Sequence, residues 1–61
     1  MKKMIGISAL HFDLEEKINI YHDYEDIKFI ECGIDGPRDI EILKRAMQKP
    51  ENQNVKFAIH L

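Results

Sequence analysis

Four side chains that binding and catalytic sites commonly use lie in, or directly after, short apolar runs of this sequence. Glu31 can accept a proton, and the His60 imidazole can ligate a metal or hold a substrate hydroxyl. We predict that Glu31 and His60 are catalytic and that His60 is also a metal ligand. We predict His11 and Ser8 as substrate-binding residues.

Each of these residues also has an ordinary structural explanation. An unpaired Glu31 carboxylate inside a strand is costly unless it meets a cation, a metal or water, but in an incomplete sheet it simply faces solvent. By the same explanation, His60 is a polar residue at the end of a strand, and His11 is an exposed loop histidine. Ser8 supplies a small volume at the inner face of the sheet. No metal motif of close spacing such as H-E-x-x-H or C-x-x-C is present, so the site prediction depends on position alone.

The elements that would position these residues alternate between strand and helix. Isoleucine-rich apolar runs predict the strands, and apolar residues at helical spacing predict the helices. This alternation is typical of parallel pairing, because each return crossover needs a helix of about a dozen residues. The expected elements are strands over 4–10, 27–34 and 55–61, helices over 14–24 and 37–49, and a polar loop over 51–54.

Local signals predict how the two helices begin and which stripe each one buries. Asp13 is expected at the N-cap of the first helix, with Glu16 three positions later as in a capping box. Pro37 suits the first position of the second helix. The expected apolar stripes are Leu14, Ile18 and Tyr21 in the first helix and Ile40, Leu43 and Met47 in the second.

Alternation along the strands separates an apolar face from a mixed face. The mixed face carries Ser8, Glu31 and His60, and such a face is typical of a barrel interior. We therefore predict one α/β unit over 1–61, a parallel three-stranded β-α-β-α-β unit with strand order 1-2-3 that forms the first part of a (β/α)8 barrel. A doubly wound order, 2-1-3, is the alternative. The predicted helix-covered face consists of Ile5, Ile7, Ala9, Ile30, Cys32, Ile34, Val55, Phe57 and Ile59.

Three segments, MIGISAL, FIECGIDGPRDIEIL and KFAIHL, resemble the first three strands of the xylose-isomerase-like barrels. That superfamily includes sugar phosphate isomerases and epimerases and endonuclease IV-like hydrolases. Glu31 and His60 match positions that the family often uses in its site. The resemblance implies a divalent metal in a full-length parent and a sugar or sugar phosphate as substrate. Such a barrel needs about 250 residues, so this segment alone is expected to be inactive.

Composition limits the other classes of function. The 61 residues carry nine basic and eleven acidic side chains, interspersed along the chain, so we do not expect binding to a nucleic-acid backbone. Cys32 is the only cysteine, which excludes an internal disulfide and favours a reducing, cytoplasmic setting. The apolar run over 4–10 is interpreted as a strand rather than a signal peptide, and no segment is expected to span a membrane.

The alternative function is that of a small free-standing α/β interaction module. Three strands with only two helices would leave both sheet edges open, and a chain this short buries little surface on its own. Two or more copies would bury what one copy leaves exposed. Self-association through the sheet edges is therefore expected.

Overall fold

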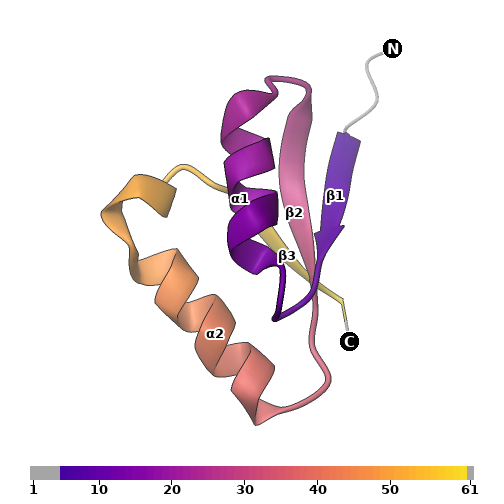
Figure 1. The fold of residues 1–61 in the computed structure, drawn as a ribbon, viewed down its shortest axis with the longest axis vertical. Coiled ribbons are helices and arrows are strands. Elements are labelled where there is room, and N and C mark those ends of the chain that lie inside the picture. The colour runs from indigo at the N-terminus through magenta and orange to yellow at the C-terminus, as the bar shows by residue number, and fades with distance from the viewer. Residues whose placement is uncertain (1–4, 61) are drawn as a thin grey trace.

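The computed structural model describes residues 5–60, which form strands and helices in alternation (Figure 1). The predicted order of elements is confirmed, while positions 4 and 61, which the sequence assigned to strands, lie outside the described residues. The strands are β1 (Ile5–Ala9), β2 (Ile27–Gly33) and β3 (Phe57–His60). The helices are α1 (Leu14–Asp23) and α2 (Pro37–Gln48), followed by the 3₁₀ helix η1 (Pro50–Asn52).

The three strands form one parallel sheet in the order β1-β2-β3. This order confirms the predicted α/β unit and excludes the doubly wound alternative. Ile7 pairs with Ile30, and Ile30 pairs with Phe57, so these three side chains share one face of the sheet. Both helices lie over that face (Figure 1), as expected for two crossovers of the same hand.

The core lies between this face and the two helices, and the central strand is its most enclosed part. Ile30 is completely buried and Cys32 is 4% exposed, because β2 has a neighbour on each side. In α1, Leu14 and Ile18 are buried as predicted, and Tyr21 packs at the margin of the core. The buried apolar residues are Ala9, Leu14, Ile18, Ile30, Cys32, Leu43, Ala46 and Val55.

The stripe predicted for α2 is wrong in two positions. Ile40 and Met47 are 45% and 48% exposed, whereas Leu43 and Ala46 are buried. Two stripes at helical spacing pass through Leu43, one with Ile40 and Met47 and the other with Asp39 and Ala46. The helix turns the second stripe toward the core. A charged residue therefore occupies the inward-facing stripe.

Two predictions for β3 also need correction. Val55 is buried in the core but precedes the strand, which begins at Phe57. Ile59 belongs to the helix-covered face by register, yet it is 61% exposed on β3, an edge strand with a neighbour on one side only. The expected loop over 51–54 instead begins within η1, where Asn52 is buried.

The start of α1 differs from the predicted capping box. Asp13 occupies the N-cap, but its side chain makes no capping hydrogen bond. Its Oδ1 instead accepts the backbone N–H of Leu10 at 2.7 Å, and its Oδ2 lies 3.6 Å from Lys17 Nζ. The Asp13 side chain thus closes the turn before the helix. Over residues 5–60, neither helix is long and apolar enough to cross a membrane.

Candidate functional site

Glu31 and His60 meet on the face of the sheet that the helices leave uncovered. The register places Glu31 beside Ala58 and His60 beside Gly33, so the two residues are diagonal neighbours near the carboxyl ends of β2 and β3. Glu31 Oε1 lies 3.9 Å from His60 Nδ1. Solvent reaches both groups, with the Glu31 side chain 45% exposed and the His60 side chain 71% exposed. The fold thus brings together the two residues predicted to be catalytic.

Ser8 lies on the same face, directly across the ladder from Glu31. The Phe29 side chain precedes Glu31 on this face, and its ring covers Gly6 so closely that a Cβ atom at Gly6 would overlap it. The uncovered face therefore combines a hydroxyl, a carboxylate and an imidazole with one aromatic ring. Such groups can hold a small polar molecule and exchange protons with it.

His11 lies elsewhere, although it was predicted to bind substrate with Ser8. It follows β1, and its Nδ1 lies 3.2 Å from Asp39 Oδ1. Together with Phe12, whose ring it contacts edge to face, His11 borders a groove between α1 and α2. The structure therefore associates His11 with the helix-covered side rather than with Glu31.

Asp39 is the residue in this region that the sequence analysis missed. Its side chain is only 11% exposed, and its second oxygen, Oδ2, accepts the backbone N–H of Asp35 at 2.8 Å. An acidic residue in the first turn of a helix often reaches back in this way, and the helix dipole favours its charge. The place of Asp39 in the first turn of α2 could have predicted its hydrogen bond with Asp35. Sequence spacing does not predict its contact with His11.

Cys32 does not qualify as a nucleophile. It is 4% exposed, and burial raises the pKa of its thiol. A raised pKa keeps the thiol protonated at neutral pH, whereas the thiolate is the reactive form. Cys32 is a small core residue, as its place on the helix-facing side predicted.

A divalent metal, which the family resemblance implies, does not fit the described residues. Glu31 and His60 would supply two donors, an oxygen and a nitrogen. No group of three or more histidine, cysteine, aspartate or glutamate side chains between residues 5 and 60 could hold a metal ion. Two exposed donors do not make a site for a bound metal.

Comparison with known proteins adds no relative. No family model, curated protein or solved structure matches the chain. The resemblance to xylose-isomerase-like barrels therefore stays a prediction that depends on residues within this chain.

Proposed function

We propose that this chain is the N-terminal part of a sugar phosphate isomerase or epimerase with a (β/α)8 barrel. The observation that carries the proposal is the Glu31–His60 pair, 3.9 Å apart on the uncovered face of a parallel sheet. In barrels of this kind, active sites lie at the carboxyl ends of the strands, inside the ring of helices. The helix-covered face and the polar uncovered face of this unit match that division.

The proposed chemistry is proton transfer next to a carbonyl. Glu31 takes the proton from the carbon beside the sugar carbonyl, while protonated His60 donates a proton to the carbonyl oxygen, which gives an enediol. His60 then takes the proton from the neighbouring hydroxyl, and Glu31 returns its proton to the former carbonyl carbon. Both side chains end as they began, and Ser8 is placed to bind a substrate hydroxyl.

The setting of the parent enzyme forms part of the proposal. Its partner is a small sugar or sugar phosphate, and its location is the reducing cytoplasm, which the single, buried Cys32 thiol favours. The divalent metal implied by the resemblance would need donors beyond Glu31 and His60. This segment alone is expected to be inactive, because two rim residues do not enclose a substrate.

The length of the open reading frame and the intact mass of its product test the proposal first. A barrel needs about 250 residues in total, so we expect a product several times larger than 61 residues. The product is then assayed for interconversion of aldose and ketose phosphates. Glu31→Gln and His60→Asn should each lower kcat by about 10²–10⁴-fold, while His22→Gln, at an exposed position on α1, should not. A 61-residue product or unchanged kcat in both variants contradicts the proposal.

A second candidate function, a self-associating interaction module, is favoured by the two open edges. β1 and β3 each have a neighbour on one side only, and Ile5 and Ile59 on these strands are 50% and 61% exposed. Open edges with apolar side chains favour pairing between chains. Sedimentation velocity over a concentration series should show association that Ile59→Lys weakens. A monomer at all concentrations contradicts this candidate.

A further inference from the structure

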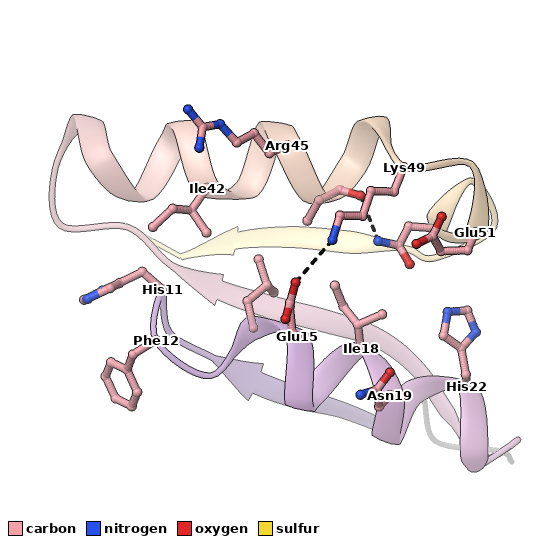
Figure 2. Close-up of a pocket in the computed structure, with 13 residues that line it drawn as sticks. His11, Phe12, Glu15, Ile18, Asn19, His22, Ile42, Arg45, Lys49 and Glu51 are labelled. Carbon is pink, nitrogen blue, oxygen red and sulfur yellow. Dashed lines mark hydrogen bonds and ion pairs between the residues drawn. The ribbon is translucent and has the colours of Figure 1, made fainter.

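The side of α2 that faces away from α1 carries an exposed apolar stripe. On the other side of this helix, Ile42 lines the groove between α1 and α2, and Figure 2 shows its side chain directed from α2 into that groove. Ile40 and Met47 lie roughly 150° around the helix axis from Ile42, and both are about half exposed. Together with Lys44, which is one helical turn from each of them, they form the outer stripe of α2.

The outer stripe of α2 lies on the same side of the molecule as the open edge of β3. α1 packs on β1 and β2, so the side of α2 that faces away from α1 is the side toward the β3 edge. The carbonyl oxygens of Lys56 and His60 accept backbone N–H groups from the β2 side. Because backbone groups alternate along a strand, those of Phe57 and Ile59 point to the open edge. The exposed Ile59 side chain, on the helix-covered face, lies beside this row of backbone groups.

The fold itself repeats the arrangement that would cover the stripe and the edge together. β1 and β2 are each followed by a helix that crosses over the helix-covered face to the next parallel strand. One more crossover of the same hand lays its helix over the outer stripe and Ile59, and its strand along β3. A second copy fits less well. A two-fold contact centred on the stripe brings two Lys44 side chains together. Pairing of the second copy's β1 with β3 leaves the stripe bare, because α1 covers its own β1 and β2.

We propose that the outer stripe of α2, Ile59 and the β3 edge form the docking surface for an amphipathic helix that leads into a parallel strand. The apolar side of the helix packs on Ile40, Met47 and Ile59, and the strand forms hydrogen bonds with the backbone of Phe57 and Ile59. This inference rests on the proposed function, because the occupant is the segment that follows β3 in the parent barrel. The docking surface is separate from Glu31 and His60, which lie on the uncovered face.

Oxidation of Met47 by hydrogen peroxide, in the product of the open reading frame, measures whether the stripe is covered. Peptide mass spectrometry follows sulfoxide formation in the folded product and in urea. We expect oxidation to be at least about tenfold slower in the folded product, because the docked helix shields the sulfur. This protection should persist on dilution, since the occupant belongs to the same chain. A smaller slowing, as for a half-exposed side chain, overturns the proposal. Protection that is lost on dilution also overturns it, because it identifies a second copy as the occupant.

Met47→Lys should lower the urea midpoint of the same product by about 0.5–1 M, because a charge replaces a side chain that the docked helix buries. Gln48→Lys is the matched control, since Gln48 is an exposed neighbour on α2 outside the stripe. Equal midpoints in the two variants overturn the proposal.

Neither measurement uses isomerase activity, so the two proposals fail separately. A long product with a protected Met47 but no isomerase activity contradicts the proposed chemistry and supports the docking surface. An active product with a reactive Met47 does the opposite. A product of 61 residues contradicts both.

Discussion

Asp39 holds the His11 imidazole from inside the molecule. Asp39 Oδ1 lies 3.2 Å from His11 Nδ1, and the aspartate side chain is four times less exposed than that of the histidine, 11% against 44%. Because Asp39 Oδ2 also accepts the N–H of Asp35, one carboxylate connects the loop after β1 to the loop after β2. A proton on Nδ1 is favoured by this contact, which leaves Nε2 as the free acceptor.

The first prediction tests this contact with Asp39→Asn. The Asp35 N–H and His11 Nδ1 approach different oxygens of Asp39, and an amide keeps an oxygen at only one of these two positions, so asparagine cannot accept from both donors in place. We expect a loss of about 1–2 kcal/mol in the free energy of unfolding and a shift of neutral His11 toward the Nε2–H tautomer. Long-range ¹H–¹⁵N correlation spectra measure the tautomer, with exposed His22 as the internal control. An unchanged His11 tautomer would show that Asp39 does not orient the ring.

Alternation and periodicity were enough to predict the parallel sheet and the central part of each face, although not the exposure of Ile5 and Ile59 at the ends of the edge strands. Ile7, Ile30 and Phe57 share a face because strand side chains alternate, whatever the tertiary structure. The meeting of Glu31 and His60 followed from the same rule together with the strand order. These features repeat along the chain, so local sequence is sufficient to define them.

The features that the sequence did not predict arise where several packing arrangements of the side chains are compatible with the same sequence pattern, and tertiary packing selects one of them. Ile40 and Met47 look like core residues, but α2 turns Leu43 and Ala46 inward and carries Asp39 on the same stripe. The burial of Asn52 depends on the carbonyl of Ala46, which accepts the Asn52 side-chain N–H at 2.8 Å in addition to the backbone N–H of the C-cap residue Lys49 at 3.3 Å. Such contacts join residues whose partners become known only once the chain is folded.

The second prediction concerns the centre of the core. Ile30→Val removes one methylene from a completely buried side chain and should lower the free energy of unfolding by about 0.5–1.5 kcal/mol. Ile59→Val is the matched control, since the same atoms are removed from a side chain that is 61% exposed. Urea denaturation followed by circular dichroism gives both values. Equal losses in the two variants would show that Ile30 is not the more enclosed residue.

The third prediction uses the ring of Phe29 over Gly6. A Cβ atom at Gly6 would overlap the ring, so Gly6→Ala must push the ring away from the sheet. We expect a cost of about 1 kcal/mol in the free energy of unfolding, at the low end for overpacking, because the ring lies on the uncovered face and can move outward. The same substitution in a Phe29→Ala background should cost under about 0.5 kcal/mol, because nothing then needs to move. A cost that persists without the ring would mean that Gly6 is required for a backbone reason.

The fourth prediction follows from the raised pKa of Cys32. The unfolded thiol ionises around its ordinary value of 9.0, while burial in the folded chain keeps the thiol protonated to higher pH. The folded state therefore binds the proton more tightly, and this contribution is fully present below pH 9.0 and is lost as pH rises through the folded-state pKa. The free energy of unfolding should fall by about 1.4 kcal/mol for each pH unit between the two pKa values.

Urea denaturation at a series of alkaline pH values measures this loss, with Cys32→Ala as the reference. The two proteins share every side chain except that at position 32, so only the difference between their curves reports the thiol. We expect the free energy of unfolding of the native chain, relative to that of Cys32→Ala, to be constant at neutral pH and to fall above pH 9.0. Parallel curves throughout would mean that the Cys32 thiolate is as well solvated in the folded chain as in the unfolded one, which its 4% exposure argues against.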